Sequence, residues 1–311
     1  MLSVQFKDIL AAQKRIAKYI ENIPVLTDEA LNKELGAQIF FKMENCQKTN
    51  SFKVRGAFNA ILAKQEEEKK LPEKIVVQSS GNHAQAIAYA CKILGSKALI
   101  YMTKDASAKK IAAAQSHGGE VILLEKRSEV NKQAAQKAED GYFFIHPSAD
   151  VNVICGQGTA ALEAIEEKGE FDAIFTPCGG GGLASGSFIV FKELLPKAKI
   201  FTCEPANAND VAISVRENKI FAFENSPNSV ADGARTLATS EICFQYLRQH
   251  DGIFEISEEE IIFWQQKLMN SFSQKVEPTS ALAIAGLAKY LKENISEKGK
   301  KFLVIISGGN I

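Results

Sequence analysis

Short apolar segments alternate along most of the chain with segments of helical periodicity. Runs of consecutive apolar residues indicate buried strands, and the stretches between them repeat apolar residues every three or four positions. Regular alternation of this kind is typical of a parallel sheet whose strands are joined by crossover helices. The predicted strands are 39–44, 75–78, 98–102, 120–124, 172–176, 199–203 and 302–306, and the predicted helices are 6–20, 27–35, 56–68, 84–94, 108–117, 128–139, 158–168, 184–194, 259–270 and 280–293.

The alternation indicates an α/β protein with parallel-rich, twisted sheets flanked by helices. Strands and helices alternate without interruption between residues 74 and 146, and a second run of the same kind begins near residue 158. We therefore predict a small α/β domain of residues 74–146. The remaining residues, 1–73 and 147–311, would form a larger domain.

The composition changes this picture by excluding several classes of protein. Of the 311 residues, 46% are hydrophobic and 24% are charged, and 37 Lys and Arg balance 37 Asp and Glu. Without a basic excess the chain is not expected to bind nucleic acid, and no apolar run is long enough for a membrane span or a signal peptide. The six cysteines include no CxxC pair, which favours reduced thiols and hence a cytoplasmic location.

Lys53 differs from the other basic residues in its neighbours. Phe52 precedes it directly, and Arg55-Gly56-Ala57 opens the helix predicted after it. A lysine held at the end of an element and partly removed from water can lose its proton near neutral pH and attack a carbonyl carbon. The alternative is an ordinary lysine at a helix start that faces water, and this segment alone does not decide between the two.

Ligands of open parallel sheets bind beyond the carboxyl ends of the strands, and four such ends here carry small or polar residues. At the first, residues 79–83 (Ser-Ser-Gly-Asn-His) open a helix whose free N–H groups suit a carboxylate or a phosphate. Because Ser and Asn are also preferred N-caps, a purely structural role is the alternative. At the second, four consecutive glycines, 179–182, suit a close approach of the backbone to an anion.

The other two strand ends are weaker signals. Residues 204–210 contain two carboxylates and loop carbonyls that could hold a hard cation such as Mg²⁺ or Ca²⁺, although their spacing alone favours an ordinary loop. Residues 307–310 (Ser-Gly-Gly-Asn) place a hydroxyl before glycines that would admit a ligand. A simple terminal turn is the alternative there.

Lys53 and the four strand ends together describe a lysine nucleophile, an anion cradle and several small hydrogen-bonding side chains. A phosphorylated aldehyde cofactor held covalently by the lysine fits this combination best. A nucleotide-dependent oxidoreductase is the main competitor, because Glu204 follows the next strand, where a ribose-binding acid would lie. Its glycine fingerprint fails by one position, since the third glycine would fall at Ser185. A non-catalytic ligand-binding protein is a further alternative.

Seven segments resemble, in order, the motifs of the serine/threonine dehydratase and serine racemase family. Members of this family are two-domain, fold-type II pyridoxal 5′-phosphate (PLP) enzymes of the tryptophan synthase β superfamily. The motifs extend over nearly the whole chain, which makes their combination highly specific. The segments are 51–57, 79–85, 156–159, 179–182, 204–205, 231–233 and 307–310.

The resemblance implies that PLP is the cofactor and binds in the larger domain. Lys53 would bind it covalently and act as a base at the substrate Cα. Ser307 would contact the pyridine nitrogen, and a neutral hydroxyl there implies a largely unprotonated nitrogen and prompt loss of the β-hydroxyl. The implied cofactor-binding residues are Phe52, Lys53, Asn82, Gly179, Gly180, Gly181, Gly182 and Ser307.

The implied reaction is β-elimination of L-serine or L-threonine to a 2-oxo acid and ammonia. Ser80 matches the acid/base that acts on the opposite face of the substrate in serine racemases, so racemisation would compete if Ser80 reprotonates Cα. The implied substrate-binding residues are Ser79, Ser80, Gly81 and His83.

The resemblance also bears on the metal, the substrate and the assembly. Glu204, the Ala208 carbonyl and Asp210 match a divalent-cation site, which reverses the preference for an ordinary loop. Residues 231–236 resemble members that act on 3-hydroxyaspartate, the alternative substrate. Arg235 could favour such an acidic substrate or could serve only in a structural ion pair. A homodimer is the expected assembly.

Overall fold

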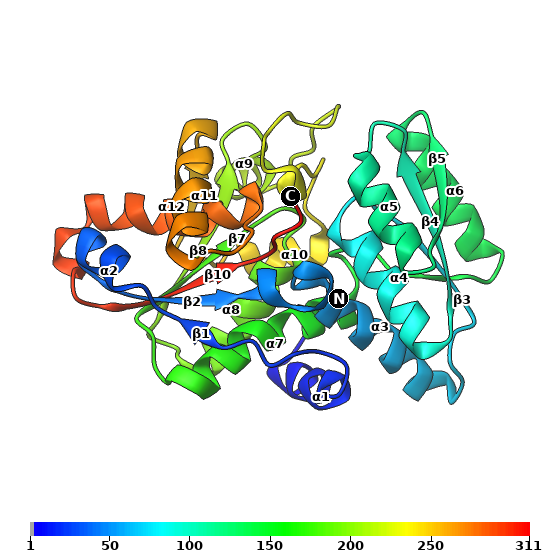
Figure 1. The fold of residues 1–311 in the computed structure, drawn as a ribbon, viewed down its shortest axis with the longest axis horizontal. Coiled ribbons are helices and arrows are strands. Elements are labelled where there is room, and N and C mark those ends of the chain that lie inside the picture. Colours follow the sequence, from blue (N-terminus) through cyan, green and yellow to red (C-terminus); the bar gives the residue numbers. More distant parts are fainter. Residues whose placement is uncertain (1–2) are drawn as a thin grey trace.

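The computed structural model describes residues 3–311. It contains two sheets, each with helices packed on both faces, as the hydrophobic pattern predicts (Figure 1). The larger sheet has the strand order β1-β2-β10-β7-β8-β9; β1 is antiparallel to β2, and the other neighbouring strands are parallel. Its strands are β1 (Val25–Leu26), β2 (Gln38–Met43), β7 (Ala173–Pro177), β8 (Lys199–Pro205), β9 (Gly252–Ile256) and β10 (Lys301–Ile306).

Two helical layers cover the larger sheet because its central strands are apolar on both faces. In β10, Phe302 and Val304 face one layer, whereas Leu303 and Ile305 face the other. The first layer contains α2 (Glu29–Leu35), α11 (Glu258–Phe272) and α12 (Pro278–Glu293). The second contains α1 (Phe6–Ile16), α7 (Val151–Lys168), α8 (Gly182–Leu194), α9 (Asp210–Glu217) and α10 (Glu241–Leu247).

The smaller sheet is entirely parallel and has the strand order β5-β4-β3-β6. All four of its strands fall between residues 74 and 146, but the exact domain boundaries stay a prediction. The strands are β3 (Lys74–Gln78), β4 (Lys97–Thr103), β5 (Glu120–Leu124) and β6 (Phe143–Phe144). Helices α3 (Lys53–Glu68), α4 (Asn82–Leu94) and α5 (Ala108–Ser116) pack on one side of it, and α6 (Arg127–Glu139) packs on the other.

Helix α7 begins seven residues earlier than the predicted helix 158–168. The Asp150 carboxylate caps it by accepting the backbone N–H groups of Asn152 and Val153. Gly156 lies inside the helix, where glycine normally indicates a break. A Cβ at this position would lie 2.6 Å from the carbonyl oxygen of Arg55, so the glycine is required for α7 to pack closely against α3.

The predictions omit β1, β6, β9, α9 and α10. Two of these strands have two residues each, and both helices have eight residues or fewer. Helices this short are stabilised by tertiary packing rather than by a long periodic pattern, so the sequence gives little signal for them. Within residues 3–311, no helix has the length and apolar character needed to span a membrane.

Candidate active site

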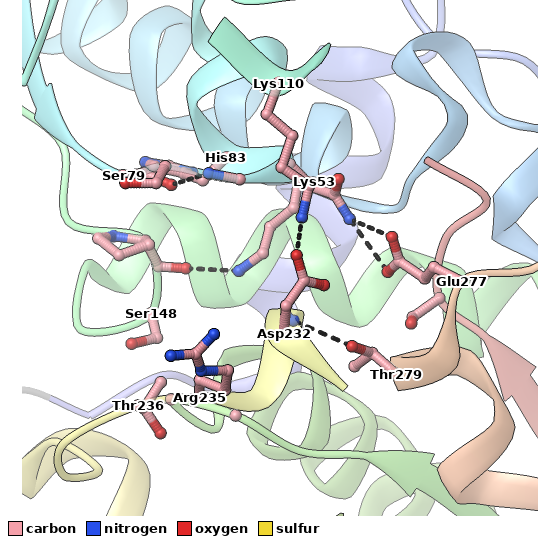
Figure 2. A pocket seen from close by; sticks show the side chains of 18 of the residues that line it. Lys53, Ser79, His83, Lys110, Ser148, Asp232, Arg235, Thr236, Glu277 and Thr279 are labelled. Carbon is pink, nitrogen blue, oxygen red and sulfur yellow. Dashed lines mark hydrogen bonds and ion pairs between the residues drawn. The ribbon is translucent and has the colours of Figure 1, made fainter. Parts of the chain in front are cut away.

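A cavity of about 390 Å³ lies between the two sheets, at the carboxyl ends of their strands (Figure 2). Three of the four predicted strand ends line it together with Lys53. They are residues 79–83 after β3, the glycines 179–182 after β7, and Ser307 after β10. The fourth, residues 204–210, does not line this cavity. A single site therefore unites most of the residues that the sequence predicts.

Lys53 is the first residue of α3, and its side chain points into the cavity (Figure 2). Its Nζ donates a hydrogen bond to the carbonyl oxygen of Pro147 at 3.0 Å and lies 4.9 Å from the ring centre of Phe52. Burial lowers the pKa of the Lys53 amine to about 8, against weaker opposing effects of neighbouring acidic groups such as Glu277. An amine with this pKa is partly neutral at physiological pH and can act as a nucleophile and a base.

The segment after β3 places polar groups at the amino end of α4. The hydroxyl of Ser79 accepts the Gly81 N–H at 3.3 Å, and Ser80 lines the cavity. His83 is buried with its Nε2 3.2 Å from the Ile145 carbonyl oxygen, and burial, reinforced by the charge of Lys53, lowers its pKa to about 3. A neutral His83 and the free N–H groups of the helix end suit a bound carboxylate.

The four glycines form a tight loop that leads into α8. Gly181, the N-cap of that helix, has φ of 92°, a conformation that favours glycine. A Cβ on Gly180 would lie 2.3 Å from the Ser148 hydroxyl oxygen. Side chains are therefore disfavoured at Gly180 and Gly181, and the backbone N–H groups of the loop together with the α8 amino end suit a phosphate.

The end of β10 is joined directly to the Lys53 segment. The carbonyl oxygen of Ser307 accepts the Phe52 N–H at 3.0 Å, and Ser51 and Gly308 form an isolated antiparallel bridge. These contacts hold Lys53 and Ser307 in a fixed relation, although more than 250 residues separate them in the chain.

Glu277 is a member of the site that the sequence predictions missed. It is 3% exposed, and its two carboxylate oxygens accept hydrogen bonds from Asn82 Nδ2 at 2.9 and 3.0 Å. Burial raises its pKa to about 7, an effect strengthened by Asp232 and opposed by the Asn82 hydrogen bonds. Glu277 directly precedes Pro278 at the start of α12, and this acidic residue before a helix-starting proline is the signal that could have indicated it.

An ion pair that the sequence analysis also missed forms part of the cavity lining. Lys110 on α5 contacts Asp232, which begins the short 3₁₀ helix Asp232–Ala234 (Figure 2). The pair connects the small sheet unit with the larger one, because α5 packs on the small sheet and residues 232–234 contact α12. The basic residues Arg127 and Arg235 line the same cavity.

The predicted cation ligands lie apart from this cavity. Glu204 and Asp210 are both buried, and Asp210 raises the pKa of the Glu204 carboxyl in addition to the larger effect of burial. The Glu204 oxygens accept backbone N–H groups of α9, whereas Asp210 Oδ2 has no hydrogen-bond partner. Among residues 3–311, no group of three or more His, Cys, Asp or Glu is arranged to hold a metal. Two buried carboxylates, one with an unpartnered oxygen, nevertheless fit a hard cation that also takes carbonyl ligands.

The cavity brings together a glycine loop suited to a phosphate and a lysine suited to a reactive carbonyl, a combination typical of enzymes that hold a phosphorylated aldehyde cofactor. The family model described as "Pyridoxal-phosphate dependent enzyme" matches residues 16–308. The chain belongs to this family, in the fold-type II group that contains the serine racemases and threonine deaminases. PLP is accordingly its cofactor, and the glycine loop and Lys53 fit that cofactor.

Several known proteins are similar to this chain over nearly its full length. The L-threo-3-hydroxyaspartate ammonia-lyase of Saccharomyces cerevisiae is 42% identical, over 100% of this chain and 94% of the relative. The crystal structure of serine racemase from Dictyostelium discoideum has a TM-score of 0.91 with 37% identity, covering 100% of this chain and 99% of its own. The processed form of threonine deaminase isoform 2 from Solanum lycopersicum has a TM-score of 0.90 with 30% identity, covering 100% of this chain and 87% of its own.

Proposed function

We propose that this protein catalyses the PLP-dependent β-elimination of a hydroxy amino acid, L-serine or L-threonine, to a 2-oxo acid and ammonia, with serine racemisation as a second activity. One observation carries the proposal: Lys53, the glycine loop, Asn82 and Ser307 all line one cavity with two helix amino ends. The names of the relatives, among them serine racemases and ammonia-lyases, support the same chemistry.

When bound, PLP supplies an aldehyde that combines with amines and a ring that withdraws electrons from the substrate Cα. Glycines 179–182 would bind its phosphate, Asn82 would donate to the ring 3′ oxygen, Phe52 would pack beside the ring and Ser307 would contact the pyridine nitrogen. The segment 79–83 binds the substrate carboxylate at the α4 amino end.

Lys53 and Ser80 divide the proton transfers in this proposal. Lys53, with a pKa of about 8, removes the Cα proton on one face of the substrate. Ser80 can return a proton to the opposite face, which inverts the configuration of serine. When the β-hydroxyl leaves before this return, elimination results.

The test of the proposed function is an assay of purified holoenzyme with L-serine, L-threonine, D-serine and 3-hydroxyaspartate. We expect 2-oxo acid and ammonia in equal amounts from at least one of them, and chiral analysis of the remaining serine should detect racemisation. A protein that cannot be loaded with PLP, or that binds it and turns over none of these amino acids, would contradict the proposal. Tight NAD(H) binding would instead favour an oxidoreductase.

We expect Ser80→Ala to reduce serine racemisation below detection while most of the L-serine elimination remains. Ser80 lines the cavity, and only racemisation requires a proton donor on its face. Chiral chromatography of serine and 2-oxo acid formation, measured on the same samples, give the two rates. Ser116→Ala is the control, because this serine is exposed on α5 and its hydroxyl donates only to the nearby Ala113 carbonyl oxygen. Equal loss of both activities in Ser80→Ala would refute the assignment of two separate bases.

A specific observation favours 3-hydroxyaspartate as a second candidate substrate. Lys110, Arg127 and Arg235 all line the cavity, and basic groups there would attract a substrate that carries a second carboxylate. Lys110 is already paired with Asp232. Arg235 donates through Nε to the Pro227 carbonyl oxygen at 2.7 Å, and this hydrogen bond does not use its two terminal guanidinium nitrogens. A kcat/KM for L-threo-3-hydroxyaspartate well above that for L-serine would decide in favour of this candidate.

We further propose that Glu204, the Ala208 carbonyl and Asp210 hold Mg²⁺ or Ca²⁺. Adding either ion at about 100 times its dissociation constant should stabilise the folded protein by about 2.7 kcal/mol, seen as a higher melting temperature. The variant Asp210→Asn should lose this response, whereas Asp105→Asn should keep it. A melting temperature that is indifferent to both ions would exclude the site.

The assembly and the location are also proposals. We propose a homodimer, as the family resemblance implies, that acts in the cytoplasm, as the absence of a CxxC pair among the six cysteines favours. Sedimentation of the holoenzyme at several concentrations would test the dimer.

A further inference from the structure

Residues 146–149 form a turn between β6 and α7 and contribute Pro147 and Ser148 to the lining of the cavity. The Pro147 carbonyl oxygen accepts a hydrogen bond from Lys53 Nζ at 3.0 Å. Within residues 3–311, it is the only hydrogen-bond acceptor that contacts this amine. The proton transfers of the proposed function do not use the contact.

The side chain of His146 holds this turn. Its Nδ1 accepts the backbone N–H groups of Ser148 at 3.2 Å and of Ala149 at 2.8 Å, which is the pattern of an Asx turn made by a histidine. Because a backbone N–H can only donate, Nδ1 carries no proton and the ring proton is on Nε2. Burial, reinforced by the charges of Lys53 and Arg127, lowers the pKa of His146 to about 4, so the acceptor is present throughout the physiological pH range.

A single peptide unit links His146 to Lys53. The Pro147 C=O and the Ser148 N–H belong to one planar trans peptide, in which these two bonds point in opposite directions. The ring nitrogen of His146 holds the N–H on one side, so the carbonyl is directed to the other side, where the Lys53 amine lies. The turn is also held from its other end, because the Ser148 carbonyl oxygen accepts the Cys243 thiol at 3.3 Å.

We propose that His146 is a positioning residue that aims the Pro147 carbonyl at Lys53 and so stabilises the ammonium form of this lysine. The inference rests on the proposed function, in which Lys53 takes the Cα proton and becomes positively charged in a buried site. Burial disfavours a charged amine, and a hydrogen-bond acceptor at 3.0 Å offsets part of that cost. His146 thus acts on the base of the reaction through one peptide unit.

The proton affinity of Lys53 measures the contribution of this bond. The probe is acetic anhydride, which reacts only with neutral amines and needs no cofactor. Acetylation of Lys53 in the cofactor-free protein is followed by mass spectrometry from about pH 6 to pH 10. His146→Phe keeps a ring but has no acceptor. We expect this variant to lower the proton affinity of Lys53 roughly fivefold to tenfold, the effect of about one hydrogen bond, so that the midpoint of acetylation moves to lower pH.

Two further variants separate the acceptor from the ring. His146→Asn is the rescue variant, because its amide oxygen can accept the same two N–H groups, and its midpoint should stay with that of the wild type. His117→Phe is the control for the loss of an imidazole, since the His117 ring packs against Tyr89 outside the cavity. All these variants keep the other titratable groups whose charge acts on Lys53 or is acted on by it: His83 on α4, Cys178 after β7, Cys243 on α10 and Glu277 before α12.

An unchanged midpoint in His146→Phe would overturn the inference. A shift in His146→Asn as large as that in His146→Phe would overturn it too, because the turn would then not depend on the acceptor. If His146→Phe does not fold, His146→Ala gives the same comparison without a ring to accommodate. Failure of the wild-type protein to bind PLP, or to turn over hydroxy amino acids, would contradict the proposed function instead and would leave the measured midpoints as they are.

Discussion

Lys53→Ala is expected to remove both the near-ultraviolet/visible absorption of the bound cofactor and the catalytic activity. Alanine has no amine to bind the aldehyde, and the base at Cα is lost at the same time. Because a positioned base alone contributes 10²- to 10⁴-fold, we expect kcat to fall by about 10⁴-fold or more. Absorption spectra and 2-oxo acid formation, recorded on the same preparations, provide the measurement.

The control for this prediction is Lys104→Ala. Lys104 lies in the loop after β4, and its side chain is 57% exposed and paired with Glu125 at the surface. Its removal should leave spectrum and activity close to wild type. If Lys53→Ala kept the absorption band of a covalently held cofactor, another amine would have to hold it, and the assignment of Lys53 would be wrong.

The pKa of Lys53 predicts how fast the cofactor-free protein captures PLP at different pH. With a pKa of about 8, roughly one amine in ten is neutral at pH 7, whereas an ordinary lysine with a pKa near 10.5 would have only about one in 3000. Only the neutral amine attacks the aldehyde. Stopped-flow absorbance should show a capture rate that rises with pH up to about 8 and then levels off. A rate that continues to rise to pH 10 would mean that Lys53 is not desolvated.

Much of the site could be predicted because its residues follow strands. The segment 79–83, the glycines 179–182 and Ser307 each come directly after a buried apolar run. Within the larger sheet, the positions after β7 and β10 must lie on one edge, so the sequence places the glycines and Ser307 near one another. The segment 79–83 follows a strand of the smaller sheet, and its approach to them depends on how the two sheets are packed. Lys53 could be singled out by its neighbours, but its approach to Ser307 depends on the bond between Phe52 and Ser307.

The missed residues depend on contacts between segments that are far apart in the chain. Glu277 belongs to the site because Asn82, 195 residues earlier, donates to it, and a single glutamate before a proline gives no indication of that partner. Lys110 and Asp232 meet only because the two sheets are packed with their carboxyl ends facing one cavity. Local pattern and propensity contain no information on such pairs.

Beneath Lys53, a buried ionic cluster fixes the start of α3. Arg55 is fully buried and binds Glu44 through two hydrogen bonds of 2.7 and 2.8 Å. It binds Glu163 through two more of 2.7 Å, and Lys42 also contacts Glu163 at 2.7 Å. Two positive and two negative charges thus compensate one another away from water. The planar guanidinium, which can bind two carboxylates side by side, suits this position better than a lysine would.

Arg55→Met is expected to lower the free energy of unfolding by about 3–5 kcal/mol, because it leaves the fully buried Glu44 carboxylate without its partner. Denaturant unfolding of the holoenzyme measures this effect. The matched control is Arg216→Met, whose side chain is 57% exposed and paired with Glu255 at the surface, and which should change stability by less than about 1 kcal/mol. Adding Glu44→Gln to Arg55→Met should recover part of the loss, since the unpaired charge is then removed. If the two single arginine variants were equally stable, the cluster would not be what holds Lys53 and the start of α3 in place.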